Sequence, residues 1–541
     1  MTLATRRPRR TSPKSSAPTQ APNNNSGARR PVNNTATLAP SDRAITCLAL
    51  ALGTFMQVLD STIANVSIPT IAGNLGVSPD QGTWVITSFA VANGVSVPLT
   101  GWLMQRYGVV RTFVFSVTMF TIASFLCGMA WSIESLIAFR ILQGAVSGPM
   151  IPGSQALLLS IFPPEKRGTA LAIWSMTTLI APICGPIFGG YISDNWSWPW
   201  IFFINLPVGA FSAFFCWRYM NKMETPTRKL PIDSVGLGLL VIWVGTLQIL
   251  LDRGKQLDWF ASTQITLLAL TSAVGFIAFM IWELTEEHPI VDLSLFKNWN
   301  FTMSTIAICL GYAVFFGNGV LLPLWLQTQI GYSATWAGLV AAPSGVVAVL
   351  ISPFVGKNLQ RWDARWFAVF AFVTFGISYY MRAQLNAEAT YADFAAPLLV
   401  QGLGLGTFFI ALVAISLQGM EPSRIPAASG MSNFLRITAG SFAVSVTTTF
   451  WDRDATFHQS RLVEASSVYD PNLQQAISGL HAMGLSDTQA VAALTHELIN
   501  QSYLMSSLDY FWISGWICFA MIGVVMLCKR TVAHGAVAAG E

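Results

Sequence analysis

The chain has 541 residues, of which 53% are hydrophobic and only 10% are charged. Because soluble domains carry about 25% charged residues, this composition excludes a soluble globular protein and predicts a membrane protein with many spans. The net charge of +4 does not indicate nucleic-acid binding, since it follows from the side of the membrane on which the basic residues lie. The seven cysteines are scattered without a C-x-x-C pair, so neither a zinc site nor a disulfide framework is predicted.

Residues 1–42 are polar and rich in Pro, Ser, Asn and Arg, and we expect them to form a disordered cytoplasmic tail. No apolar region follows Arg6–Arg10 at the distance that a cleavable signal peptide requires. This basic run either attracts the anionic headgroups of membrane lipids or acts only as a determinant of topology. Residues 531–541 form a second, short tail, which we also expect in the cytoplasm.

Apolar stretches close to the roughly 20 residues that a bilayer requires recur after the first tail. We predict an all-α polytopic protein with fourteen spans, at 45–69, 82–104, 112–131, 136–160, 168–192, 199–217, 235–252, 264–283, 300–326, 336–356, 366–384, 394–418, 426–451 and 509–529. With the first tail in the cytoplasm, 23 Arg and Lys fall on the cytoplasmic side, 5 on the opposite side and 2 inside spans. The positive-inside rule therefore places both termini in the cytoplasm.

Asp60 lies about midway along the first predicted span. A carboxylate at the centre of a membrane helix costs roughly 2.5–3.5 kcal/mol on insertion scales, and such residues usually face a bundle interior or a water-filled cavity. On a helix, Gln57, Ser61 and Asn65 share one face, with Asp60 beside it. This polar stripe predicts an internal pathway, and the alternative is a structural hydrogen bond between helices.

Two sequence patterns recur at nearly the same distance along the chain. Gly101-WLMQ-Arg106 returns as Gly356-KNLQ-Arg361, 255 residues later. Gln143-Gly144 returns as Gln401-Gly402, 258 residues later. Near-equal offsets predict two related halves, a plan in which transporters place their site near the midplane between the halves.

The repeat and the span count together predict the domain organisation. An N-terminal six-helix bundle covers 43–220, and a C-terminal six-helix bundle covers 299–530. The region 221–298 holds a linker and two inserted transmembrane helices. Within the second bundle, we expect the segment 452–508 on the side away from the cytoplasm. Ser486 and Gln489 have capping-box spacing before an apolar run, which predicts a short amphipathic helical hairpin that acts as a docking surface or a lid.

Seven stretches between residues 43 and 530 resemble a known family. They are LDSTIANVSIPTIAGNL (59–75), QGTWVITSFAVAN (81–93), GWLMQRYGVVR (101–111), RILQG (140–144), APICGPIFGGYISD (181–194), WIFFINLPVG (200–209) and LDRGKQLDWF (251–260). Together they resemble the major facilitator superfamily, specifically its fourteen-span drug:proton antiporter branch. The resemblance implies the fold of that superfamily and a location in the inner membrane of a bacterial cell.

Arg140 lies early in the fourth span, in the R-x-x-Q-G pattern of the family. A buried guanidinium is always charged and needs an acceptor, and Asp60 is the nearest intramembrane carboxylate on offer. If the two pair, Asp60 is held ionised, and if desolvation dominates, it holds a proton. Switching between these conditions is what proton coupling requires, and the alternative is that Arg140 only joins helices. No histidine lies within a predicted span.

Two further motifs of the family concern conformational change. Gly185-Pro186-x-x-Gly189-Gly190 on the fifth span matches the antiporter motif, and it predicts a kinked, closely packed helix that suits a rocking hinge. Gly101 to Arg111 matches the loop between spans two and three, where Arg106 and Arg111 act as anchors or as a gate. The usual acidic residue of that loop is replaced by Gln105, which speaks against a charge relay.

Polar and aromatic residues near mid-span are the candidates for substrate binding. They are Gln57, Asn65, Asn93, Gln143, Asn318, Trp325, Gln327 and Asn433. The alternative for each is a hydrogen bond between helices or an aromatic at the lipid interface. Arg436, in the thirteenth span, is a second buried charge for which the sequence suggests no partner.

These observations favour a secondary exporter that exchanges an inward proton for an outgoing hydrophobic drug, either cationic or weakly acidic. The proton gradient replaces a cofactor, no metal is expected, and no nucleophile–base set indicates an enzyme. The resemblance implies antibiotic resistance and a tripartite efflux pump, with a periplasmic adaptor and an outer-membrane channel as partners. A proton-coupled importer or facilitator of a small metabolite is the alternative on the same fold.

Overall fold

The computed structural model describes residues 39–163, 166–228, 231–287, 289–359, 361–386, 388–465 and 470–530, and their regular elements are all helices. This agrees with the predicted all-α fold. Most of the first predicted tail and all of residues 531–541 lie outside the described residues.

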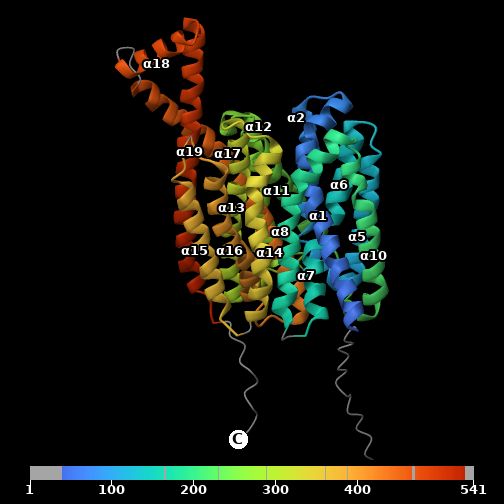
Figure 1. The fold of residues 1–541 in the computed structure, drawn as a ribbon. Coiled ribbons are helices and arrows are strands. Elements are labelled where there is room, and N and C mark those ends of the chain that lie inside the picture. The colour runs from blue at the N-terminus through green and yellow to red at the C-terminus, as the bar shows by residue number, and fades with distance from the viewer. Residues whose placement is uncertain are drawn as a thin grey trace, which may run out of the picture. The chain divides into compact units, whose positions relative to one another are not determined.

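Among the described residues, the first half contains ten α-helices and the 3-10 turn η2. They are α1 (Pro40–Leu75), α2 (Pro79–Gly82), α3 (Trp84–Ser96), α4 (Thr100–Tyr107), α5 (Val109–Gly128), α6 (Ile133–Ser147), α7 (Met150–Ile161), α8 (Arg167–Asn195), α9 (Trp200–Phe203), α10 (Asn205–Met220) and η2 (Asn221–Met223). In Figure 1, α1 begins at the lower end of the bundle and rises to α2 at the upper end.

The insert and the second half follow. They comprise α11 (Ser234–Arg253), η3 (Trp259–Ala261), α12 (Thr263–Thr285), η4 (Leu293–Lys297), α13 (Trp299–Thr328), α14 (Ala334–Asn358), α15 (Ala364–Arg382), α16 (Tyr391–Ser416), η5 (Pro422–Arg424), α17 (Ile425–Ala465), α18 (Pro471–Ala482) and α19 (Asp487–Met526). The end of α19 lies at the lower end of the bundle, as the start of α1 does (Figure 1).

Nine helices among the described residues are long and apolar enough to cross a membrane, and the bent pair α3–α4 gives a tenth. The prediction of fourteen spans stays a prediction. Two of the predicted spans are broken. The second bends by 57° between α3 and α4, next to Pro98, and the fourth divides into α6 and α7 at Pro149. Proline explains both breaks, because it lacks the N–H that continues a helix.

The recurring glycines serve matching contacts in the two halves. A Cβ atom added at Gly144 would lie 2.5 Å from the Phe89 carbonyl oxygen, so that α6 approaches α3 closely. A Cβ atom added at Gly402 would lie 2.6 Å from the Ser344 carbonyl oxygen, so that α16 approaches α14. Each half therefore uses a glycine at the equivalent position to bring the same pair of helices together.

The two halves touch at the lower end through the other recurring glycine. A Cβ atom added at Gly101 of α4 would lie 2.8 Å from the Cβ of Ala427 on α17. A Cβ atom added at Gly356 of α14 would lie 2.6 Å from the Gly168 carbonyl oxygen on α8. At the lower end the two halves therefore approach each other closely at two glycines, which leave no room for larger side chains.

The insert joins both halves at the upper end. Thr87 of α3 donates to the carboxylate of Asp252 on α11 over 2.5 Å. On the other side, the indole N–H of Trp259 donates to Thr449 of α17 over 3.0 Å. The α11–α12 hairpin therefore bridges the first and second halves.

The segment 452–508 is helical, and residues 466–469 lie outside the described residues. Figure 1 shows α18 with the adjoining ends of α17 and α19, extending beyond the upper ends of the other helices. The predicted cap is present, since the side-chain oxygen of Gln489 accepts from the Ser486 N–H over 2.9 Å. The hairpin is longer than expected, because it continues the last two spans without a break. We call α18 and these adjoining ends the projecting segment.

Candidate functional site

Asp60 lies inside the first half, and its side chain is fully buried. Three side chains donate to its carboxylate: Arg140 over 2.6 Å, Asn205 over 2.8 Å and Gln143 over 3.1 Å. All three are donors, which suits a carboxylate that accepts and cannot donate. The pairing of Asp60 with Arg140 that the sequence left open is therefore present.

Arg140 is also fully buried, and it is tied to several neighbours. Its Nε donates to the Val85 carbonyl over 3.0 Å, and its Nη1 donates to Gln143 over 2.7 Å. The guanidinium carbon lies 4.2 Å from the ring centroid of Phe89. These contacts act together with the link to Asp60 in holding the guanidinium in place.

Helix geometry explains how the cluster assembles. Arg140 and Gln143 are three residues apart on α6, so they lie on one face of that helix. Asn205 opens α10, where a break after α9 aims its side chain at α1. Its amide also donates to Ser124 of α5 over 2.9 Å. Three helices, α1, α6 and α10, therefore meet at Asp60, and α5 joins them through Asn205.

Sequence reasoning missed Asn205 and Ser124. Both are neutral residues in apolar runs, so neither carries the charge signal that identified Asp60 and Arg140. Asn205 lies within the family motif WIFFINLPVG, which was the one available sign of its importance.

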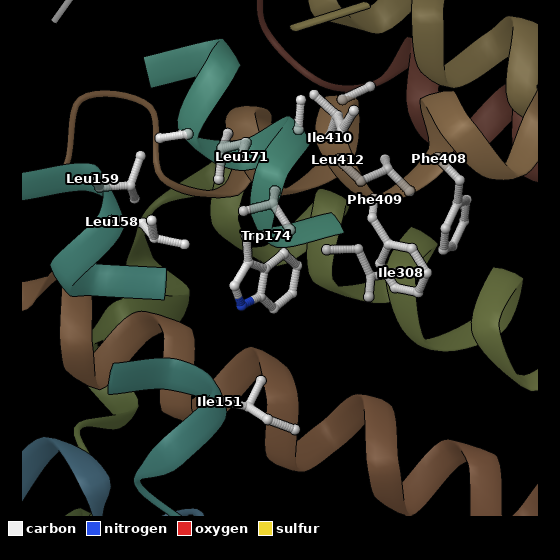
Figure 2. Packing of buried hydrophobic residues seen from close by; sticks show 14 of the residues in the cluster. Ile151, Leu158, Leu159, Leu171, Trp174, Ile308, Phe408, Phe409, Ile410 and Leu412 are labelled. Carbon is white, nitrogen blue, oxygen red and sulfur yellow. The ribbon is translucent and has the colours of Figure 1, made fainter. Parts of the chain in front are cut away.

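A cavity lies between the two halves, apart from the Asp60 cluster. It is lined by Gln155 and Trp174 from the first half and by Ile308, Phe409, Val413, Ser416, Leu417, Ser429, Ser432, Asn433 and Arg436 from the second. Figure 2 shows the Trp174 indole in the same cluster of buried residues as Ile308 and Phe409. The cavity measures about 10 Å³, which is close to the space of one water molecule.

Among the predicted substrate-binding residues, Asn433 lines this cavity and Gln143 joins the Asp60 cluster. Asn93 of α3 donates to Ser147 of α6 over 2.6 Å, so it makes a hydrogen bond between helices, which was the alternative to substrate binding. Asn318 likewise donates to Ser514 over 3.0 Å.

The remaining candidates lie elsewhere. Trp325 is buried against Phe394 in the second half, and Gln327 is exposed and donates to the carbonyl of its own helix. Gln57 is buried, and its carbonyl oxygen has no partner among the described residues. The side chain of Asn65 lies outside the described residues.

The glycines of the antiporter motif pack inside the first half. A Cβ atom added at Gly185 would lie 2.1 Å from the Thr62 hydroxyl, and one at Gly189 would lie 2.7 Å from the Ile63 carbonyl oxygen. Both neighbours belong to α1, so the motif presses α8 against the helix that carries Asp60. Gly190 follows on the same helix, and the side chain of Pro186 lies outside the described residues.

The loop at the lower end has an acidic partner that the sequence did not reveal. Glu224 accepts from the backbone N–H of Val110 over 3.0 Å and of Arg111 over 2.8 Å, which caps the start of α5. The side chain of Arg106 lies over the rings of Trp102 and Tyr107.

Asp454, His458 and Asp509 meet where the projecting segment begins, with one ligand atom of each within 4.8 Å of the others. The sequence predicted no metal site, and it places Asp509 far from the other two residues. The His458 ring nitrogen lies within hydrogen-bond distance of Asp509, at 2.9 Å, and 3.4 Å from Asp454.

Comparison with known proteins places these features in a family. Residues 50–444 match the model of the Major Facilitator Superfamily. The chain is 48% identical to the multidrug export protein EmrB of Escherichia coli K12 over 492 aligned residues. The alignment covers 91% of this chain and 96% of the relative. It is 46% identical over 482 residues to the fatty acid resistance protein FarB of Neisseria gonorrhoeae, in an alignment that covers 89% of this chain and 95% of the relative.

Solved structures agree on the fold. The crystal structure of the human organic anion transporter MFSD10 aligns with a TM-score of 0.56 at 12% identity, covering 90% of this chain and 100% of the other. The resemblance of the sequence motifs is therefore confirmed over most of the chain. The chain is a multi-pass membrane protein that belongs to the Major Facilitator Superfamily.

Proposed function

We propose that this chain is a proton-driven multidrug efflux antiporter of the bacterial inner membrane, with both termini in the cytoplasm. The observation that carries the proposal is the fully buried carboxylate of Asp60, held by Arg140 at 2.6 Å. The similarity to export proteins for drugs and to a fatty acid resistance protein supports hydrophobic toxic compounds as the cargo.

Coupling follows from competition between a proton and Arg140 for the same carboxylate. A protonated Asp60 has no charge to attract the guanidinium, and Arg140 keeps its contacts with Gln143 and the Val85 carbonyl. The link between α1 and α6 is then weakened, and α1 is the helix against which the antiporter glycines of α8 pack. Proton transfer at Asp60 therefore changes the packing of the first half.

The transport cycle uses this change. Drug binding from the cytoplasm or the inner leaflet favours loss of the Asp60 proton to the inside. The halves then rock, opening the lower contacts at Gly101 and Gly168 in one state and closing them in the other. The drug leaves outward, and a proton from outside re-occupies Asp60. The proton gradient is the energy source, and no cofactor takes part.

The test uses proteoliposomes that contain the purified chain and a pH-sensitive dye in the lumen. Addition of a hydrophobic drug to the wild type should trigger proton release from the lumen, and the same liposomes without protein give the control. A proton-coupled importer, the alternative on this fold, would carry proton and substrate in the same direction. Proton movement that accompanies the drug into the lumen would therefore overturn antiport.

We further propose that the chain works in a tripartite pump, with an EmrA-like periplasmic adaptor and an outer-membrane channel. The projecting segment is the proposed contact, because it extends beyond the bundle at the end opposite to the start of α1 (Figure 1). A photo-crosslinker placed on α18 should capture the adaptor in cells that contain it. One placed at Gln105, at the lower end, should not, and equal capture from both positions would contradict the assignment.

A further inference from the structure

Three side chains of the types that bind metal ions meet at the base of the projecting segment. Asp454 and His458 are four residues apart on α17, so they lie on one face of that helix. Asp509 comes from the neighbouring helix α19. One ligand atom of each residue lies within 4.8 Å of the ligand atoms of the other two. Neither the transport cycle nor the proposed contact with the adaptor uses this cluster.

The two helices are fixed against each other directly beside the cluster. The indole N–H of Trp451 on α17 donates to the hydroxyl of Ser507 on α19 over 2.9 Å. Ser506 of α19 donates in return to the Trp451 carbonyl over 2.9 Å. Trp451 precedes Asp454 by one helical turn, and Ser507 lies close to Asp509 in the sequence. These hydrogen bonds therefore hold the three ligands together before any ion binds.

The spacing of the ligand atoms suits one small ion. The Nε2 atom of His458 lies 2.9 Å from an oxygen of Asp509 and 3.4 Å from an oxygen of Asp454. Two ligands of a tetrahedral zinc ion, each about 2.1 Å from the metal, lie about 3.4 Å from each other. The side chain of Asp509 is half exposed, so its carboxylate can rotate towards Asp454 without a change in the backbone.

One carboxylate oxygen of the cluster has no hydrogen bond. Asp454 Oδ2, which faces His458, is buried and has no hydrogen-bond partner among the described residues. Buried polar atoms are normally satisfied, so this oxygen indicates a missing ligand. A protonated His458 has one N–H at Nε2, and Asp509 at 2.9 Å takes it, so the imidazolium alone leaves Asp454 Oδ2 without a partner. With a neutral imidazole, the cluster carries two negative charges, which a divalent cation neutralises.

We propose that Asp454, His458 and Asp509 bind one zinc ion or a similar divalent transition-metal ion. Imidazole nitrogen and carboxylate oxygen are both ligands of zinc, and imidazole favours transition metals over magnesium and calcium. The fourth coordination position is open to water on the side of the exposed Asp509. The ion joins α17 to α19 and thereby fixes the direction in which the projecting segment leaves the bundle. This inference does not rest on the proposed export function.

The test measures zinc binding by calorimetry to the full-length chain in nanodiscs, at about pH 7.5, which is above the ordinary pKa of histidine. The protein is purified without a polyhistidine tag and is stripped of metal with a chelator. The wild type should bind one zinc ion per chain, with a dissociation constant of about 1 μM or lower. His458→Gln and Asp509→Asn should each weaken binding roughly tenfold or more. Because Asp509 is exposed, its variant remains informative even if His458→Gln does not fold.

His481 provides a matched control within the projecting segment. Its Nε2 atom lies 3.1 Å from Asp487, but no second carboxylate joins this pair in the described part of the chain. His481→Gln should therefore leave the affinity for zinc unchanged. Amide hydrogen exchange reports the second part of the proposal. Zinc should slow exchange in residues 451–460 of the wild type, and it should have no such effect in Asp509→Asn.

Two calorimetric results would overturn the proposed site. One is a wild type that binds no zinc, and the other is zinc binding that is unchanged in both His458→Gln and Asp509→Asn. Loss of binding in His481→Gln alone would overturn it as well, because the ion would then lie elsewhere in the projecting segment. Binding at the site without slower exchange in residues 451–460 would show that the ion does not join the two helices.

Discussion

The ion pair between Asp60 and Arg140 predicts a large coupling free energy in a double-mutant cycle. The pairing atoms lie 2.6 Å apart, and both side chains are fully buried. Removal of one partner leaves an uncompensated buried charge, which lowers the free energy of unfolding by about 3–5 kcal/mol. We therefore expect a loss of that size for Asp60→Asn and for Arg140→Gln. The double variant holds no buried charge at this site, so it should lose no more than either single variant.

Reversible unfolding in mixed detergent micelles, followed by circular dichroism, measures these free energies. The control combines Asp60→Asn with Arg382→Gln, because Arg382 is a buried arginine of the other half. Losses at two sites without shared partners should add to within about 0.5 kcal/mol. If the losses for Asp60→Asn and Arg140→Gln also add, the two residues do not act as a pair and the reasoning is refuted.

Three further predictions concern the frame around the site. Gly101→Val should hold the halves apart at the lower end, since a Cβ atom there would already lie 2.8 Å from an alanine of α17. Disulfide cross-linking between cysteines placed in α4 and α17 should therefore fall. The control Gly319→Val, where an added Cβ atom has no neighbour within 4 Å, should leave the cross-linking unchanged. Glu224→Gln should lower the free energy of unfolding by about 1 kcal/mol, because it weakens the cap of α5, and an unchanged melting temperature would contradict that role. Thr87→Val should loosen α11 from the first half and speed amide hydrogen exchange around Asp252, and unchanged exchange would show that this bond does not hold the insert.

The centre of the site could be predicted because charged side chains are costly in apolar spans. Asp60 and Arg140 each interrupt a hydrophobic run, and each needs a partner in the bundle. The sequence could not show that they meet, because they are 80 residues apart. Asn205 was missed since a neutral amide in an apolar run has no comparable signal, and only the break between α9 and α10 aims it at Asp60.

Span ends and cavity walls were harder to predict. Arg382 lies near the end of the predicted span 366–384 and was not recognised as a buried charge. In the structure it turns inward and donates to Gln401, a contact between neighbouring helices that hydropathy does not encode. Gln155 and Trp174 line the cavity only because the two halves face each other there. Arg436 was recognised as a buried charge, but its surroundings required the fold.

Transport by Asp60→Asn tests the central claim most directly. Proteoliposomes that contain the wild type or the variant are given a hydrophobic drug. The movement of the drug across the membrane is followed with and without a proton gradient. The account predicts that the wild type moves drug against its concentration when protons flow the other way. The variant should still exchange labelled for unlabelled drug without a gradient, but it should not accumulate drug when a gradient is imposed. If Asp60→Asn accumulates drug as the wild type does, Asp60 is not the proton carrier and the proposed mechanism is wrong.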